Sequence, residues 1–402
     1  MELHRHRLHL LLPLSWMTFT TTYLCRLNLS TVLDQLAGEL GTSSELLGFA
    51  GSLYFIFCAL GQLINGSYGD RAEPFRMIML ALVLTGGVNL VLSFHPPVCV
   101  FFLLWAVNGF SQSMYWGTLL RLLSQNSAVS QRKNISATMS TCSVAGYLIS
   151  WCGFGLLFGT GSSRPYFLVP GLIALGLIPA WAVLFRSGGR GVRHTDQSAL
   201  SFKGLMRQLI SERIIYVCLL CFLIGAIQEG TVFWLPKIAS TTLGLGDTSL
   251  LLLVIIPFSK LFGVLIARGL LSLWLERIRL CICSLTLAGG ILSLMLLLTH
   301  RHISMLTILL IAALIAVING CNWYAISYLP MLFSAKNIVA FLACIFDFST
   351  YLGAALTSGL IGYLLEAFGW AALPALWLLL VLAGFLLALT CLGRCLDRIA
   401  QN

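Results

Sequence analysis

The sequence predicts an all-α membrane protein of about twelve transmembrane helices, arranged as two six-helix halves. Hydrophobic residues make up 58% of its 402 residues and charged residues only 9%, whereas soluble proteins carry about 25% charged residues. The apolar runs reach the length of roughly 20 residues that a helix needs to cross the hydrocarbon core. Because the alternating pattern of a membrane barrel is absent, helices are the structure expected to satisfy the backbone within lipid.

The apolar runs form two groups with a polar stretch between them. We expect an N-terminal six-helix half at 1–186 and a C-terminal six-helix half at 214–402. The stretch 187–213 is rich in Gly, Ser and basic residues, and it predicts a cytoplasmic linker whose end lies on the membrane surface. The expected spans are 10–36, 45–68, 75–94, 98–124, 135–158, 166–185, 214–235, 248–271, 278–298, 303–333, 338–365 and 370–392.

The distribution of basic residues predicts the orientation of the chain. Most of the 24 Lys and Arg residues fall in links on one side of the predicted membrane, and Arg164 and Arg301 fall in links on the other. Cytoplasmic links carry an excess of Lys and Arg, so both termini and the linker are expected in the cytoplasm. The basic N-terminus has no small-residue cleavage site, which predicts a retained first helix. The expected location is the plasma membrane, and specifically a bacterial inner membrane.

A short charged link at 61–76 separates the second and third expected spans. It contains Gly66, Asp70, Arg71 and Arg76. A glycine lets a neighbouring helix approach closely, and Asp70 can pair with a helix end or an Arg and release it when two parts of a bundle separate. The alternative is a cytoplasmic turn whose charges only fix the topology.

The pattern Gly66-x-x-x-Asp70-Arg71-x-x-Pro74-x-Arg76 resembles the loop 2–3 signature of the major facilitator superfamily. Its proline resembles the organophosphate:phosphate antiporter branch, which includes glycerol-3-phosphate and hexose-phosphate carriers. The resemblance implies the major facilitator fold and transport by alternating access, with the solute bound between the two halves. Three further stretches resemble this branch: Tyr23-x-x-Arg26-x-Asn28, Gln112-x-Met114-x-Trp116 with Arg121, and Tyr351-Leu352-Gly353 through Gly362-Tyr363 to Phe368-Gly369-Trp370.

Arg26 lies near the middle of the first expected span. A charge at that depth costs about 2.5–3.5 kcal/mol on insertion scales, so it needs a function or a partner. An Arg that faces a closed cavity can bind a phosphate or carboxylate with two hydrogen bonds, and the resemblance implies such a contact here. The alternative is a structural ion pair with Glu229 or Asp347.

The seventh span departs from the resembled family. The resemblance implies a second Arg there, but this sequence has Gln228 followed by Glu229. Lys260 in the eighth span restores a second positive charge if it faces the cavity, whereas its ammonium can instead extend toward the cytoplasm. Glu229 and Asp347 are buried acids that can carry a proton, or else they pair with Arg26, Arg121 and Lys260 and take no part in transport.

Other polar and aromatic residues can line the cavity. For each of them, contact with the solute and ordinary helix packing are equally good explanations. Belts of Trp and Tyr are also expected at the membrane interfaces. The residues that can line the cavity are Tyr23, Gln112, Tyr115, Trp116, Asn319, Asn322 and Tyr324.

The sequence contains no P-loop and no catalytic constellation, so it predicts neither an enzyme nor an ATP-driven pump. Cys218-x-x-Cys221 lies within an apolar run, and we interpret both cysteines as small apolar packing residues. We therefore expect no metal and no cofactor. The expected partners are a small solute, membrane lipid, and either a coupling proton or inorganic phosphate. We do not expect the protein to bind nucleic acid, and we expect it to be a monomer.

The favoured hypothesis is therefore a secondary carrier of a small anionic or zwitterionic solute, which works by exchange or by proton coupling. One alternative is a proton-coupled carrier of a non-phosphorylated solute. Another is a membrane sensor of a sugar phosphate or related solute, because the resembled family includes such a receptor. The same motifs would serve binding without flux.

Overall fold

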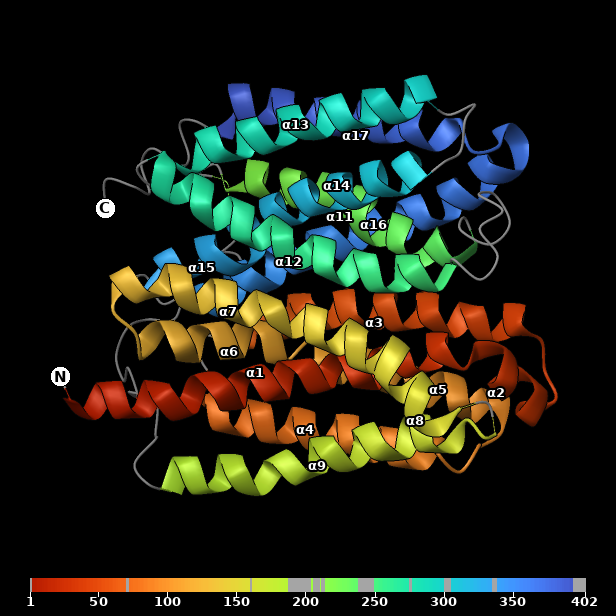
Figure 1. The fold of residues 1–402 in the computed structure, drawn as a ribbon. Coiled ribbons are helices and arrows are strands. Elements are labelled where there is room, and N and C mark those ends of the chain that lie inside the picture. Colours follow the sequence, from red (N-terminus) through yellow and green to blue (C-terminus); the bar gives the residue numbers. More distant parts are fainter. Residues whose placement is uncertain are drawn as a thin grey trace. The chain divides into compact units, whose positions relative to one another are not determined.

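The structure is a computed structural model, and its described residues form helices joined by loops (Figure 1). No strand occurs among the described residues. These residues divide into two compact units, Met1–Ala199 with Pro330–Phe348, and Leu200–Leu329 with Ser349–Asn402. The structure describes residues 2–69, 72–159, 161–186, 204, 210, 214–237, 249–274, 277–299, 305–334 and 338–392.

The first unit is built from the helices that precede the predicted linker, together with a segment from late in the chain. That segment comprises the end of α15 (Leu329–Leu332) and the first part of α16 (Val339–Phe368). The earlier helices are α1 (Glu2–Thr31), α2 (Leu33–Leu40), α3 (Ser44–Gly69), α4 (Pro74–Leu92), α5 (Val98–Gln112), α6 (Tyr115–Gln125), α7 (Val129–Leu148), the π-helix η1 (Ile149–Gly153), α8 (Phe154–Phe158) and α9 (Arg164–Arg186).

Within the first unit, α4 packs against α9, α3 against α5, and α1 against α7. Trp105 on α5 lies buried between the rings of Phe101 and Phe167. In the same unit, the Asn28 side-chain amide donates to Asn89 Oδ1, 2.8 Å away. Asn108 in turn donates to the backbone carbonyl of Cys25, also at 2.8 Å. These bonds hold α1, α4 and α5 together inside the unit, where unpaired amides would be costly.

The second unit is built from the later helices. In it, α13 packs against α14 and α17, and α12 and α14 lie along one another. The last part of α16 also belongs to this unit. Its other helices are α11 (Ile215–Lys237), α12 (Ser249–Leu273), α13 (Ile278–Thr299), α14 (Met305–Asn322), the π-helix η4 (Trp323–Tyr328) and α17 (Ala372–Thr390).

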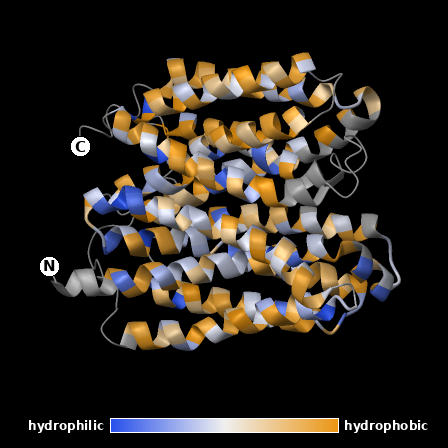
Figure 2. Cartoon of the chain, viewed as in Figure 1, coloured by the Kyte–Doolittle hydropathy of each residue, from blue (hydrophilic) through white to orange (hydrophobic). Residues whose placement is uncertain are grey.

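Hydrophobic residues predominate along the helices (Figure 2), and many large apolar side chains are exposed rather than buried. Leu156, for example, is 87% exposed, which is expected only where lipid replaces water around the molecule. Ten helices of the described residues are long and apolar enough to cross a membrane, and α11 adds a shorter apolar stretch, Ile215–Glu229. The predicted all-α membrane fold is confirmed, whereas the full count of twelve spans stays a prediction. The boundary of the two six-helix halves and the linker 187–213, which lies largely outside the described residues, also stay predictions.

Several expected spans are interrupted. The expected span 10–36 ends as α1 at Thr31, where the hydroxyls of Ser30 and Thr31 both donate to the Leu27 carbonyl at 2.8 Å. The expected span 98–124 breaks between α5 and α6, where the Ser113 hydroxyl donates to the Phe110 carbonyl at 2.7 Å. Such bonds compete with the helical hydrogen bonds and bend helices. In the expected span 303–333, η4 separates α14 from α15.

A polar cluster joins three links on the predicted outer side of the first unit. Ser163 donates to Glu39 through its backbone N–H, at 3.0 Å, and through its hydroxyl. His95 Nε2 lies 3.3 Å from the same carboxylate and 2.9 Å from the Ser163 hydroxyl. Burial alone raises the pKa of Glu39, but the Ser163 hydrogen bonds and His95 outweigh burial and hold it below its ordinary value.

We predict that this cluster makes stability depend on acid. A carboxyl whose pKa is lowered by folding contributes stability above its unfolded pKa, and this contribution is lost as the pH falls through the folded pKa. The detergent-solubilised protein should therefore lose melting temperature below about pH 4. Glu39→Gln should reduce that loss and cost about 1 kcal/mol near neutral pH.

The matched control is Glu73→Gln, because Glu73 pairs with Arg76, whose side chain is 81% exposed. This variant should melt like the wild type at neutral pH, since exposed pairs contribute little. Identical acid profiles of Glu39→Gln and wild type would contradict the prediction.

Candidate solute-binding and gating residues

Arg26 lies half-buried on α1 with its guanidinium 4.1 Å from the centre of the Tyr23 ring. This distance is that of a cation–π contact. Tyr23 in turn packs over Gly146 on α7, where any added Cβ would collide with its side chain, and its ring lies 5.7 Å from that of Tyr147. The absence of a side chain at Gly146 thus allows α1 and α7 to approach and sets the position of the ring beneath Arg26.

The predicted lining residues of α5 and α6 already take part in internal contacts. The Tyr54 hydroxyl donates to Gln112 Oε1 at 2.7 Å, and Gln112 Nε2 donates to Asn108 at 3.3 Å. The Trp116 ring lies 4.5 Å from that of Phe19 on α1. The structure therefore joins Gln112 to the buried amide network of the first unit and places Trp116 against the helix that carries Arg26.

Asp347 lies in the part of α16 that belongs to the first unit, and the structure gives it a partner that the sequence did not indicate. The Gln62 side-chain amide on α3 donates to Asp347 Oδ2 at 2.5 Å. The other end of that amide, Gln62 Oε1, is buried without a hydrogen-bond partner among the described residues. The pair is separated by 285 positions, so no local pattern could have found it.

Gly66, the first residue of the predicted gating motif, lies at the same contact between α3 and α16. A Cβ at Gly66 would sit 2.7 Å from the Cβ of Cys344, and one at Gly117 on α6 would sit 2.8 Å from its Sγ. Both glycines thus make room for Cys344. Arg76 pairs with Glu73 at 3.0 Å.

The Arg121 guanidinium donates to the Ala72 carbonyl at 3.0 Å, so α6 holds the end of the charged link. Asp70 and Arg71, the central pair of the predicted motif, lie outside the described residues.

The second unit brings Glu229, Lys260 and Gln228 together. Lys260 Nζ lies 3.1 Å from Glu229 Oε1, and the two side chains are 3% and 19% exposed. Gln228 Nε2 donates to the same carboxylate oxygen at 3.1 Å and to Asn319 Oδ1 at 3.2 Å. The Asn319 amide then donates to the Lys260 backbone carbonyl at 2.7 Å. The result is a closed network across α11, α12 and α14.

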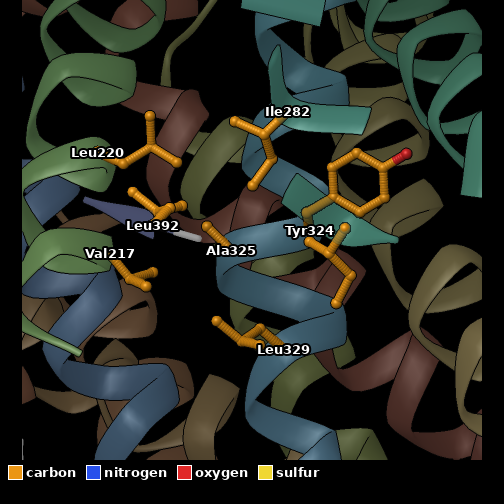
Figure 3. A pocket seen from close by; sticks show the side chains of 8 residues that line it. Val217, Leu220, Ile282, Tyr324, Ala325, Leu329 and Leu392 are labelled. Atoms are coloured by element: carbon orange, nitrogen blue, oxygen red, sulfur yellow. The ribbon is translucent and has the colours of Figure 1, made fainter. Parts of the chain in front are cut away.

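Two other predicted lining residues behave differently. Asn322, the last residue of α14, has its side-chain oxygen buried without a hydrogen-bond partner among the described residues. The Tyr324 hydroxyl donates to the Ala267 carbonyl of α12 at 2.6 Å. Its ring also borders a small apolar pocket with Leu220 and Ile282 (Figure 3). This lining holds no charged side chain, which makes the pocket unsuited to an anion.

Polar residues that the sequence reading missed are Tyr54, Gln62, Asn65, Asn89 and Asn108, each buried inside the first unit. Their signal is visible in the sequence as amides and a phenol within apolar runs, which are costly unless paired. Within the part of the chain that the structure describes, no cluster of His, Cys, Asp or Glu could hold a metal ion.

Comparison with known proteins identifies the family. The sequence profile of the Major Facilitator Superfamily matches residues 14–356. The chain belongs to the Major Facilitator Superfamily. Among solved structures, a bacterial homologue of the iron transporter ferroportin in an outward-facing state has a TM-score of 0.77 at 12% identity, covering 98% of this chain and 100% of that one. The proton:xylose symporter XylE has a TM-score of 0.74 at 15% identity, covering 96% and 95%. At these identities the likeness shows the fold.

Two curated relatives confirm the resemblance to the organophosphate:phosphate antiporter family. A "Probable hexose phosphate transport protein" of Chlamydia pneumoniae is 24% identical over 39% of this chain. The "Membrane sensor protein UhpC" of Salmonella typhimurium is 27% identical over 42% of this chain. The matched segments span about a third of the relatives' own length, 34% and 38% respectively. The prediction of a transporter fold rather than an enzyme fold agrees with this family.

We predict that Gly66→Ala destabilises the protein by about 1–3 kcal/mol, the cost of overpacking a close contact. The reason is the 2.7 Å approach to Cys344. Cys344→Gly should recover part of that loss, judged against Cys344→Gly alone in a double-mutant cycle. Thermal melting in detergent measures both the loss of stability and its recovery.

The matched control is Gly87→Ala on α4, because no atom lies within 4 Å of the position that its Cβ would take. It should melt at or slightly above the wild-type temperature, since alanine is the better helix former. Equal melting of Gly66→Ala and Gly87→Ala would show that the contact with Cys344 is not tight.

A second prediction concerns the buried ion pair. Lys260→Met leaves the Glu229 carboxylate without its cation and should lower stability by about 3–5 kcal/mol, whereas the double variant Lys260→Met/Glu229→Gln should recover much of the loss. Arg76→Met is the control, because its pair with Glu73 is exposed and should cost under about 1 kcal/mol. A double variant no more stable than Lys260→Met would contradict the pairing.

Proposed function

We propose that this protein is a secondary transporter of a small organic anion or zwitterion, which works by alternating access in a bacterial inner membrane with both termini in the cytoplasm. Membership of the Major Facilitator Superfamily supports transport. The likeness to a hexose phosphate transport protein supports a phosphorylated or otherwise anionic sugar as the class of solute. Arg26 is the proposed anchor for the anionic group, because guanidinium binds carboxylate and phosphate through a planar pair of donors.

The observation that carries the proposal is the pairing of Lys260 with Glu229, 3.1 Å apart. Gln228 and Glu229 stand where the resembled family has a second Arg, and the nearby Lys260 is balanced by a carboxylate. The second unit therefore adds a neutral pair rather than a second fixed cation. A solute with one negative charge, or with one anionic and one neutral or cationic part, fits this charge balance better than a dianion gripped by two arginines.

The second candidate function is a membrane sensor, favoured by the 27% identity to the membrane sensor protein UhpC. A sensor and a carrier can share the same binding residues. They differ in whether the bound solute crosses the membrane.

Proteoliposomes separate the two functions. We expect loaded vesicles to exchange radiolabelled glucuronate, a hexose with a single carboxylate, better than glucose 6-phosphate, whose phosphate carries close to two negative charges at neutral pH, and not to exchange glucose. Thermal shift of the purified protein provides the binding measurement, because a ligand of the native state raises the melting temperature. Binding without exchange would favour the sensor. If the protein neither binds nor exchanges either anion, the proposed solute class is wrong.

We predict that Arg26→Lys weakens binding of the anionic solute by at least about tenfold, although the charge is kept, because an ammonium offers a point charge where a planar fork is needed. The control is Arg164→Lys: Arg164 also lies over an aromatic ring, that of Phe94 at 5.1 Å, but at the exposed start of α9. It should bind like the wild type. Unchanged affinity in a well-folded Arg26→Lys protein would assign Arg26 a structural role.

A further inference from the structure

A series of hydrogen bonds in the first unit starts at the Arg26 side chain and returns to the same helix. The Arg26 side chain bonds to the Tyr54 hydroxyl on α3. That hydroxyl donates to Gln112 Oε1 on α5 at 2.7 Å, and Gln112 Nε2 donates to Asn108 Oδ1 at 3.3 Å. The Asn108 amide donates at 2.8 Å to the carbonyl of Cys25, the residue before Arg26. Together these bonds form a closed circuit, the Arg26 circuit, that ties the guanidinium to its own backbone through α3 and α5.

The chemistry of the side chains gives the bonds of the Arg26 circuit one direction. A guanidinium carries only N–H donors and no acceptor, so the Tyr54 oxygen must accept from Arg26. The phenol has a single O–H, which it donates to Gln112 Oε1. The Gln112 nitrogen then faces Asn108 Oδ1, and the Asn108 nitrogen is left to donate to Cys25. Each group thus accepts from one neighbour and donates to the next, an arrangement in which the bonds strengthen one another.

Tyr54 is also held against α5 by packing. Its side chain is 3% exposed, and its ring lies 6.0 Å from that of the buried Trp105. Gly109 on the same helix lies against the Tyr54 backbone, where a Cβ on the glycine would collide with the Tyr54 carbonyl. Asn108 and Gln112 are buried as well, so water does not compete for the bonds of the circuit. The phenol therefore occupies a fixed place on a packed helix, as a residue that orients another side chain must.

We propose that Tyr54 is a positioning residue for Arg26, which holds the guanidinium, through the Arg26 circuit, in the orientation that binds the anionic group of the solute. A fork of parallel donors binds a carboxylate or phosphate only when its plane is correctly set. An arginine side chain otherwise loses much rotamer freedom on binding, so fixing its orientation in advance lowers the cost of binding. This inference rests on the proposed role of Arg26 as the anchor, and it adds the residues that orient it.

The orientation of Arg26 can be measured without any solute, by NMR of the detergent-solubilised protein with isotope-labelled arginines. The signal of Arg26 is the one that is missing in Arg26→Lys. We expect its N–H protons to exchange with water at least about tenfold faster in Tyr54→Phe than in the wild type, because only the hydroxyl is removed and the bond to it is lost. Equal exchange rates in Tyr54→Phe and the wild type would overturn the proposal, even if the protein transports anions.

The matched control is Tyr166→Phe. The Tyr166 hydroxyl donates to the Gly159 carbonyl at 2.9 Å, so this variant also removes a phenol bond from the first unit but leaves the Arg26 circuit intact. It should leave the exchange of the Arg26 protons unchanged. Faster exchange in Tyr166→Phe and Tyr54→Phe alike would show a general loosening of the unit and would overturn the proposal.

Binding of glucuronate, measured by titration calorimetry, is the second test. Tyr54→Phe should weaken binding by about tenfold, and Tyr166→Phe should bind like the wild type. In an Arg26→Lys background, Tyr54→Phe should have no further effect, because Tyr54 acts only through the guanidinium. Independent, additive losses would overturn the proposal, since Tyr54 would then contact the solute itself. So would a Tyr54→Phe protein that melts lower but binds like the wild type, because the phenol would then only join α3 to α5.

A double variant covers the case in which Tyr54→Phe does not fold because Gln112 Oε1 loses its donor. Tyr54→Phe/Gln112→Met replaces both partners by apolar side chains of similar size, which costs less than leaving one unpaired. Asn108 Oδ1 keeps a donor in Asn89 Nδ2 at 3.4 Å. Wild-type exchange of the Arg26 protons in this variant would overturn the proposal. If the wild type does not bind glucuronate but the exchange at Arg26 still depends on Tyr54, the solute class fails and the positioning role stands.

Discussion

The balance of buried charge is the constraint on which the second unit depends. Lipid offers no water to solvate an ammonium, so Lys260 requires the carboxylate of Glu229, 3.1 Å away. That requirement fixes the facing sides of α11 and α12. The amides of Gln228 and Asn319 complete the arrangement, because they bond to the carboxylate and to the Lys260 carbonyl and so tie α14 to the same point. One ion pair and two amides thus bond these three helices to one another.

Close helix contact is the corresponding constraint in the first unit. Helices in lipid gain nothing from burying one apolar face against another, so association depends on tight packing and on hydrogen bonds. Both occur where α16 meets α3: Gly66 and Gly117 leave space for Cys344, and Gln62 donates to Asp347 one turn further along.

The sequence was sufficient to predict the helical fold, because runs of apolar residues have one stable backbone in lipid. It did not predict where helices break. Thr31 and Ser113 are ordinary residues of apolar spans, and their hydroxyls bond to carbonyls three or four residues earlier. Thr18 and Thr21 make the same bonds inside the unbroken α1, so the residue types alone do not mark a break. Nor could it choose among the roles of Lys260. Whether an ammonium extends to the interface or meets Glu229 depends on how two helices face each other, and residue spacing along the chain does not contain this information.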